Sequence, residues 1–447
     1  MKDFTSGKMS KPLVAFAAPM LVGNLFQQMY SLVDAMVVGQ FVGGGALAAV
    51  GVSLSVVMFL SSTTIGLTTG SALLISQFFG AKQYDKLKSA VSVSIIFLAV
   101  LSLLLTAVGI IFAPQLLRLL NTPPEVFDEA LLYMRIMIGG LIFTVFYNMY
   151  TAYMRALGET RRPLYILIFS VVLSGILTVY LVAVLNMGVF GAAISTLFSQ
   201  LLAAVLSFIY ARRKMELLTV KKLTFDPKLF WLIIKYGVPT ALQMSLVAVA
   251  QLFITRLINS FGHTALAGIT AVGRIDSLAT MPVATLSLAV STVVAQNMGA
   301  RLEDRAIKGF KIGLMYMLGY AILISVVLMI FAPQLISMFI DQNDPYLADI
   351  ILVGQQYLNI MVIFYFLFAF LFGFVGFFRG VGDVVMGMVF TTISLGIRTL
   401  SAYGLVHFAG MGPEALAWSI PMGWGISSIA GWIHYRRRRW VGKVATG

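Results

Sequence analysis

The sequence predicts an all-α polytopic membrane protein with twelve transmembrane helices in two six-helix lobes, related by an internal repeat. Three observations support this fold class. Of the 447 residues, 60% are hydrophobic and only 11% are charged, against about 45–50% and about 25% in soluble proteins. Apolar segments long enough to cross about 30 Å of hydrocarbon recur along the chain. The second half of the chain repeats motifs of the first, which indicates a duplicated unit.

Twelve apolar segments account for the predicted helices. They cover residues 13–40, 47–79, 89–112, 131–154, 163–185, 190–211, 231–259, 265–296, 309–332, 352–378, 384–406 and 413–435. Transmembrane β-strands would be about ten residues long, with strict alternation of apolar and polar side chains, and none of the segments has that pattern. We expect no signal peptide, because the first segment is too long and carries Asn24, Gln27, Gln28 and Asp34.

The positive charges predict the orientation of these helices. Lys and Arg are concentrated before the first helix, in every second connection and in the tail, whereas connections such as the one with Glu125 and Asp128 are acidic. Because cytoplasmic loops carry the excess of Lys and Arg, we expect both termini in the cytoplasm and the protein in the cell membrane. This distribution accounts for the net charge of +14, so a nucleic-acid partner is not expected.

The internal repeat is visible as motifs at a fixed offset. Phe112-Ala113-Pro114-Gln115 recurs as Phe331-Ala332-Pro333-Gln334, and Arg155…Gly158-Glu159 recurs as Arg379…Gly382-Asp383. The offset is 219 positions for the first motif and 224 for the second. Each copy therefore holds six helices and enters the membrane from the same side.

The repeat also divides the chain into expected domains. We assign an N-lobe to residues 1–211, a cytoplasmic linker to 212–230, a C-lobe to 231–435 and a basic tail to 436–447. Two halves related by an axis along the membrane normal, with a substrate path between them, are typical of secondary transporters. Since no Walker A motif is present, the driving force is expected to be a gradient of an ion or of the substrate.

Ionisable residues inside the predicted spans are the first functional candidates, because charges in hydrocarbon are costly. Five lie well inside: Asp34, Arg256, Arg274, Asp276 and Arg398. Asp34 is the only acid in a span of the first half and is a candidate proton carrier; the alternative is a structural hydrogen bond or partial exposure at the outer end. Arg274 and Asp276 are two positions apart and face different directions. We therefore expect Asp276 to meet Arg256 or Arg398, in a C-lobe polar cluster that serves either structure or transport.

Several motifs, in order and duplicated, cover nearly the whole chain. They are Pro19…Gln28…Val33-Asp34…Gly39…Gly43, Gln77-Phe78-Phe79-Gly80-Ala81-Lys82, Arg155-Ala156-Leu157-Gly158-Glu159, Gly188…Gly191-Ala192-Ala193, Met281-Pro282, Gln296-Asn297-Met298-Gly299-Ala300 and Arg379-Gly380-Val381-Gly382-Asp383. Together they resemble the MATE (multidrug and toxic compound extrusion) family, bacterial type. The resemblance implies twelve helices in two lobes, a V-shaped central cleft, and export of organic cations and drugs in exchange for protons or sodium ions.

The resemblance also assigns individual residues. Asp34 matches the first-helix aspartate that bacterial members use for cation coupling, whereas the Asn and Asp of the fifth helix correspond to Ser174 and Thr178 here. Gln28, Ser174 and Thr178 are then a possible N-lobe site for a cation or substrate. The seventh-helix Glu and tenth-helix Asp of another branch have no counterpart, because segments 231–259 and 352–378 contain no acid. These departures favour coupling to protons over sodium.

Other readings of the sequence stay open. The repeat counterpart of Ser174 is Arg398, and the three arginines in the C-lobe spans would also suit a flippase of lipid-linked saccharides or an exporter of a small anionic or zwitterionic metabolite. A membrane enzyme or scaffold is the alternative of another class. We do not expect an enzyme, because no paired acids, nucleophile–base set or metal cluster is visible, and cysteine is absent. We expect a monomer with no cofactor or metal, whose partners are organic cations and the bilayer.

Overall fold

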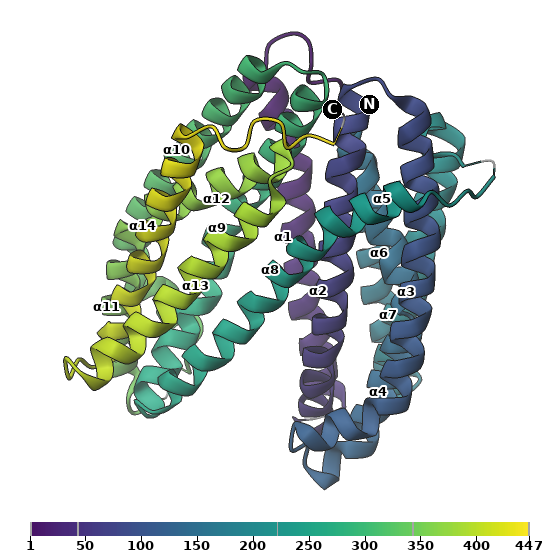
Figure 1. The fold of residues 1–447 in the computed structure, drawn as a ribbon. Coiled ribbons are helices and arrows are strands. Elements are labelled where there is room, and N and C mark those ends of the chain that lie inside the picture. The colour runs from purple at the N-terminus through teal and green to yellow at the C-terminus, as the bar shows by residue number, and fades with distance from the viewer. Residues whose placement is uncertain (1, 43, 221, 342–343, 446–447) are drawn as a thin grey trace. The chain divides into compact units, whose positions relative to one another are not determined.

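The structure is a computed structural model, and it describes residues 2–42, 44–220, 222–341 and 344–445; for residues 30–35, 38, 44 and 46–48 it describes the backbone alone. The described residues form helices and no β-strand, which confirms the all-α fold class. They pack as two units (Figure 1). Unit 1 comprises Met1–Asp3 and Ala18–Ala241, and unit 2 comprises Phe4–Ala17 and Leu242–Gly447.

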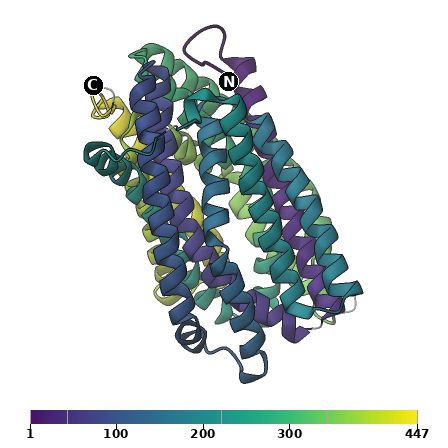
Figure 2. The ribbon, with the colours of Figure 1, turned by 90° about the vertical axis from the view of Figure 1, so that its right-hand side faces the viewer.

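Unit 1 contains the helices of the first repeat. Figure 2 turns this unit toward the viewer and shows its long helices running side by side. Its elements are α1 (Ser10–Phe41) from Ala18 onward, α2 (Gly44–Gly80), α3 (Tyr84–Leu119), α4 (Pro124–Gly139), α5 (Leu141–Ala156), α6 (Arg161–Val179) with the π-turn η1 (Tyr180–Val184), α7 (Gly188–Lys214), η2 (Glu216–Leu218), and α8 (Pro227–Asn259) as far as Ala241.

Unit 2 contains the helices of the second repeat. Its elements are the first turns of α1, the rest of α8, α9 (His263–Gly299), α10 (Glu303–Ser337), α11 (Leu347–Ile363), α12 (Tyr365–Val381), α13 (Val384–His407) and α14 (Glu414–Arg436). The segment before α1 is tied to this unit, because the Phe4 backbone N–H donates to Gln296 Oε1 at 3.0 Å and Arg305 Nε donates to the Phe4 carbonyl at 3.1 Å. Two of the boundaries between the units fall inside helices, in α1 after Ala17 and in α8 after Ala241, and the third lies before α1, after Asp3.

The helices agree with the predicted spans. In the described part of the chain, eight helices are long and apolar enough to cross a membrane, and ten are if each of two bent helix pairs counts as one span. The remaining two predicted segments, 13–40 and 413–435, are also helical: they correspond to α1, with 32 residues, and α14, with 23. The chain is a polytopic membrane protein.

The two bent pairs make the repeat visible in the backbone. α4 and α5 meet at a bend of 44°, and α11 and α12 meet at a bend of 51°. The breaks fall at Gly140 and Phe364, which are related by the 224-position offset of the sequence motifs. The sequence analysis treated each pair as one uninterrupted span, so it did not foresee the bends.

Within unit 1, α2 and α8 cross with their backbones in contact. A Cβ atom added at Gly70 would lie 2.4 Å from the Gly237 Cα atom, and one added at Gly66 would lie 2.3 Å from the Ala241 Cα atom. Small residues spaced four apart on both helices permit this approach, which is a frequent way to pack membrane helices. The nearby Tyr236 hydroxyl donates to Gln77 Oε1 at 3.2 Å.

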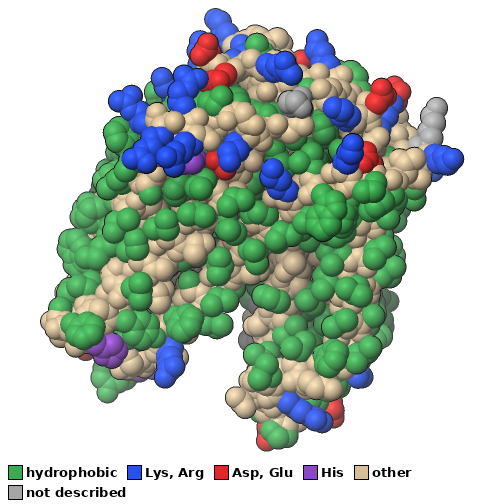
Figure 3. Space-filling view, viewed as in Figure 1, with side chains coloured by type: hydrophobic (Ala, Val, Ile, Leu, Met, Phe, Trp, Pro, Cys, Tyr) green, Lys and Arg blue, Asp and Glu red, His purple; other side chains and the backbone are tan. Residues whose placement is uncertain are grey.

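The surface of each unit is largely apolar, as the high hydrophobic content of the sequence leads us to expect. In Figure 3 the long sides of each unit are covered by hydrophobic side chains, and most Lys and Arg of the unit gather at one end of its helices. Exposed apolar residues on α3 and α10 illustrate these sides: Val100, Leu103 and Leu104, and Ile322 and Leu323. Large exposed apolar faces of this kind are stable in lipid, where backbone groups are satisfied inside the helices.

Candidate functional site

Polar side chains from four helices of unit 2 meet around Asp276. The Tyr365 hydroxyl, at the first residue of α12, donates to Asp276 Oδ1 on α9 at 2.8 Å. Arg398 on α13 acts electrostatically on both Asp276 and Tyr357, and Tyr357 lies on α11. We call these four residues the Asp276 cluster. The two tyrosines are buried, while Asp276 and Arg398 are partly exposed.

The local fold explains how these side chains converge. The 51° bend between α11 and α12 places Tyr365 directly after the break at Phe364. The Tyr365 ring packs against Trp424 of α14, with centroids 6.2 Å apart. Gly423 lets α13 and α14 approach closely, since an added Cβ would lie 2.4 Å from the Ser394 carbonyl oxygen and 3.3 Å from Arg398 Cβ. Together these contacts determine the directions from which Tyr365 and Arg398 approach Asp276.

The Asp276 cluster contains one acid and one arginine, and one hydrogen-bond donor of the arginine is left without an acceptor. Asp276 carries one negative charge when ionised, and Arg398 supplies the positive charge that acts on it. Arg398 Nε is buried and has no hydrogen-bond partner among the described residues. A buried donor without an acceptor costs about 1–3 kcal/mol. The cluster therefore holds the Asp276 carboxylate through the Tyr365 hydroxyl, and the Arg398 Nε–H is free for an anionic or carbonyl group.

Two of the four residues predicted for the C-lobe polar cluster lie outside it. Arg256 is exposed, and so is Arg274, whose guanidinium lies 5.8 Å from the centroid of the Phe339 ring. Arg274 lines a separate cavity of about 470 Å³, together with His263 and Asp341. Helical geometry explains why Arg274 lies outside the Asp276 cluster. Two positions along an α-helix rotate a side chain by about 200°, so Arg274 and Asp276 point to opposite sides of α9.

The N-lobe candidates are only partly visible in the structure. The backbone of Asp34 belongs to α1, but its side chain lies outside the described residues. Gln28 is exposed on the same helix, whereas Ser174 and Thr178 are buried on α6. The hydroxyls of Thr178 and Ser195 lie 2.7 Å apart, and Ser195 donates to the Ala192 carbonyl at 2.8 Å. Either hydroxyl of this pair can donate to the other.

Sequence reasoning missed one further buried pair. His434 Nε2 on α14 lies 2.9 Å from Asp383 Oδ2, at the start of α13, and both side chains are largely buried. The rings of Phe378 and Phe390 pack against the imidazole at 5.0 and 5.9 Å. Asp383 ends the repeated Arg379…Asp383 motif, which was the available signal. The pair ties the ends of two helices together, and the described residues contain no group of three or more His, Cys, Asp and Glu that could hold a metal.

The electrostatic interaction between Asp276 and Arg398 should be measurable as a coupling energy in the stability of the protein. We expect Arg398→Gln to lower the free energy of unfolding by about 1–3 kcal/mol, because it leaves a partly buried carboxylate without its countercharge. Adding Asp276→Asn should restore part of the loss, giving a coupling energy of about 0.5–3 kcal/mol in a double-mutant cycle. Denaturant unfolding of the detergent-solubilised protein measures these values.

Arg256→Gln is the matched control for this cycle. Arg256 is an exposed arginine of the same unit, so its replacement should change the stability by less than about 0.5 kcal/mol. Simple additivity of Asp276→Asn and Arg398→Gln would show that the two side chains do not stabilise each other.

Comparisons with known proteins agree on one family. The family model described as MatE matches residues 19–181 and 239–403, one match in each repeat. The chain is 30% identical over 443 residues to the probable multidrug resistance protein YpnP of Bacillus subtilis (strain 168), covering 98% of this chain and 97% of the relative. It is also 27% identical over 360 residues, 78% of each chain, to a protein of Shewanella oneidensis named FAD transporter.

Solved structures show the same fold. A structure described as the outward-facing conformation of a multidrug resistance MATE family transporter of the MOP superfamily aligns with a TM-score of 0.90 over 97% of both chains, at 23% identity. The fold match covers both units, as does the match in sequence.

Proposed function

Because the chain belongs to the MATE family of multidrug efflux transporters, we propose that it exports organic cations across the cell membrane in exchange for protons. Asp34 is the proposed coupling residue, and sodium is the alternative ion. Alternating access of an N-lobe, residues 1–211, and a C-lobe, residues 231–435, is the proposed mechanism. The protein acts as a monomer and without a cofactor in this proposal.

The main support for this proposal is that charged residues are unevenly distributed between the spans of the two halves. Well inside the spans of the first half, Asp34 is the one ionisable residue; the second half has Asp276 and three arginines. In the C-lobe, Arg398 lies near enough to Asp276 to act on its charge. The one arginine or lysine in a predicted N-lobe span is Arg135, which is exposed near an end of segment 131–154. We therefore expect a proton or a cationic substrate to neutralise Asp34 instead. The proton and the cationic substrate compete for the Asp34 carboxylate, and this competition couples their transport.

The residues at the fifth-helix positions favour the proton. Hard cations prefer carboxylate and carbonyl oxygens, and Ser174 and Thr178 offer hydroxyls there. The Thr178 hydroxyl oxygen also lies within hydrogen-bond distance of the Ser195 hydroxyl, at 2.7 Å. A proton needs one acceptor, which Asp34 supplies. Protonation of Asp34 from the outside then removes the charge that holds the substrate, and the substrate leaves outward.

The available driving force is sufficient for efflux. One pH unit corresponds to about 1.4 kcal/mol, or a tenfold concentration ratio per proton. The membrane potential adds about 2.3 kcal/mol per charge for each 100 mV. We therefore expect concentration ratios of ten or more at an ordinary proton gradient.

A second candidate cargo is a small anionic metabolite. It is favoured by the buried Arg398 Nε without a partner and by the relative named FAD transporter. Proteoliposomes with an imposed pH gradient distinguish the two cargoes when ethidium and FAD are offered in turn. Gradient-dependent ethidium transport without FAD transport is the expected result, and the reverse would overturn the proposed substrate class.

The proposed orientation, with both termini in the cytoplasm, is testable because the chain has no cysteine. We expect Glu125→Cys, in the first turn of α4, to react with a membrane-impermeant maleimide on intact cells. Lys86→Cys, near the connection between α2 and α3, should react only after the membrane is opened. Both positions are exposed, so the inverse labelling pattern would reverse the orientation.

A further inference from the structure

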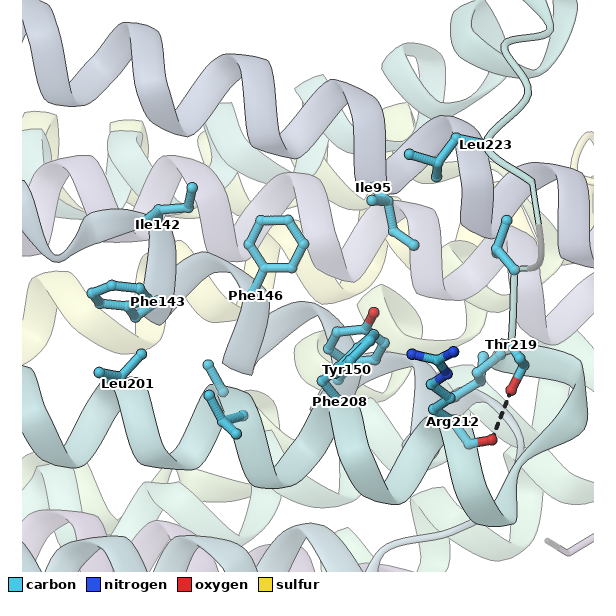
Figure 4. Close-up of a pocket in the computed structure, with 14 residues that line it drawn as sticks. Ile95, Ile142, Phe143, Phe146, Tyr150, Leu201, Phe208, Arg212, Thr219 and Leu223 are labelled. Carbon is cyan, nitrogen blue, oxygen red and sulfur yellow. Dashed lines mark hydrogen bonds between the residues drawn. The ribbon is translucent and has the colours of Figure 1, made fainter.

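Unit 1 contains an apolar cavity of about 520 Å³ between α3, α5, α7 and the segment that follows α7. Figure 4 shows its lining side chains pointing into a common space. Ile142, Phe143 and Phe146 come from α5, Leu201 and Phe208 from α7, and Ile95 from α3. Volumes of about 300–1,000 Å³ are usual for pockets that bind small organic molecules.

The helices present these residues from one face each. Phe143, Phe146 and Tyr150 are three and four positions apart on α5, and Leu201, Phe208 and Arg212 are seven and four apart on α7, so each set lies along one side of its helix. The Tyr150 and Phe208 rings meet edge to face at 5.8 Å. The cavity is therefore an elongated apolar trough that runs along α7 toward Arg212.

The end of the trough is polar and positive. Arg212, Thr219 and the Tyr150 ring lie together there in Figure 4, and Thr219 Oγ1 donates to the Arg212 carbonyl oxygen at 3.2 Å. Among the described residues no ion pair of the Arg212 guanidinium is seen, and the Glu216 carboxylate, four positions further along the chain, lies 3.5 Å from Lys88 Nζ. Arg213 and Lys214 follow directly and add further positive charge.

We propose that this trough is a binding site for an anionic phospholipid of the bilayer. An acyl chain lies along the apolar walls, and the headgroup phosphate accepts hydrogen bonds from the Arg212 guanidinium, whose planar fork suits phosphate. Basic pockets between membrane helices recognise anionic headgroups in this way. The surplus of positive charge disfavours zwitterionic lipids, and Arg212 also disfavours the organic cations of the proposed function. The bound lipid would join α3, α5, α7 and the segment after α7.

Native mass spectrometry of the purified full-length protein tests the site. We expect one molecule of phosphatidylglycerol to remain bound where phosphatidylcholine with the same acyl chains is lost. Arg212→Gln should weaken phosphatidylglycerol binding by about tenfold, equivalent to about 1.4 kcal/mol. Val205→Trp, which fills the trough from a half-exposed position on α7, should prevent binding. Phosphatidylglycerol should also raise the melting temperature of the wild-type protein, less so that of Arg212→Gln, and not that of Val205→Trp.

Arg213→Gln is the matched control, because Arg213 is an exposed neighbour that does not line the cavity. It should bind phosphatidylglycerol as the wild type does, and inorganic phosphate or ethidium should not displace the lipid. Equal retention of both lipids, or equal weakening by Arg212→Gln and Arg213→Gln, would overturn the proposal. Stabilisation by inorganic phosphate alone would show that the site takes a free anion and would overturn the assignment to lipid.

Discussion

Asp34→Asn is expected to abolish pH-driven efflux, lowering the initial rate by at least about tenfold. Asparagine keeps the shape of the side chain but neither binds a proton nor attracts a cation at neutral pH, so the competition that couples proton and substrate is lost. The measurement is efflux of a fluorescent organic cation from vesicles under an imposed pH gradient. Asp34→Glu retains the carboxylate and should keep part of the activity.

Asp276→Asn is the matched control for this prediction. It removes the other acid that lies well inside a predicted span, and Arg398 already acts on the charge of that acid. We expect this variant to lose stability but to keep pH-driven efflux at the level of its folded fraction. Undiminished pH-driven efflux in Asp34→Asn, or its loss in Asp276→Asn alone, would contradict the assignment to Asp34. Either result would assign proton coupling to the Asp276 cluster.

Gly70→Ala is expected to destabilise unit 1 by about 1–3 kcal/mol, the usual cost of inserting a methyl group into a packed interface. The added Cβ would lie 2.4 Å from the Gly237 Cα atom and 2.5 Å from the Tyr236 carbonyl oxygen. Both neighbours are backbone atoms, so no rotamer change relieves the contact and the two helices must separate. Thermal unfolding followed by size-exclusion chromatography measures the loss.

Gly51→Ala is the control on the same helix. An added Cβ at Gly51 meets no heavy atom within 4 Å, and alanine has the higher helix propensity. We expect this variant to be as stable as the wild type or slightly more so. Similar melting temperatures for Gly70→Ala and Gly51→Ala would show that α2 and α8 do not pack backbone to backbone.

The sequence predicts most of the fold because bilayer thickness constrains it strongly. A helix that crosses hydrocarbon needs about 20 apolar residues, and this requirement located the spans, while motifs repeated at a fixed offset revealed the duplication. The bends at Gly140 and Phe364 were not predictable in the same way. Gly140 follows a second glycine, but no glycine or proline adjoins Phe364 to mark the bend of 51° between α11 and α12.

The C-lobe site was predictable in its charges but not in its geometry. The cost of burying a carboxylate indicated a basic partner for Asp276, and the structure brings Arg398 to it but leaves Arg256 and Arg274 exposed. Tyr365 was missed, because a tyrosine in an apolar segment gives no sign of the direction in which it points. Its bond to Asp276 depends on the break just before it.

Proton flow driven by substrate tests the central claim of proton-coupled export most directly. Sodium-free proteoliposomes with a pH dye in the lumen and a clamped membrane potential receive a permanently charged organic cation from outside. Because inward movement of the cation is exchanged for protons, the lumen should become alkaline with the wild-type protein and stay unchanged with Asp34→Asn. Transport of the cation that requires sodium and leaves the pH of the lumen constant would contradict the account.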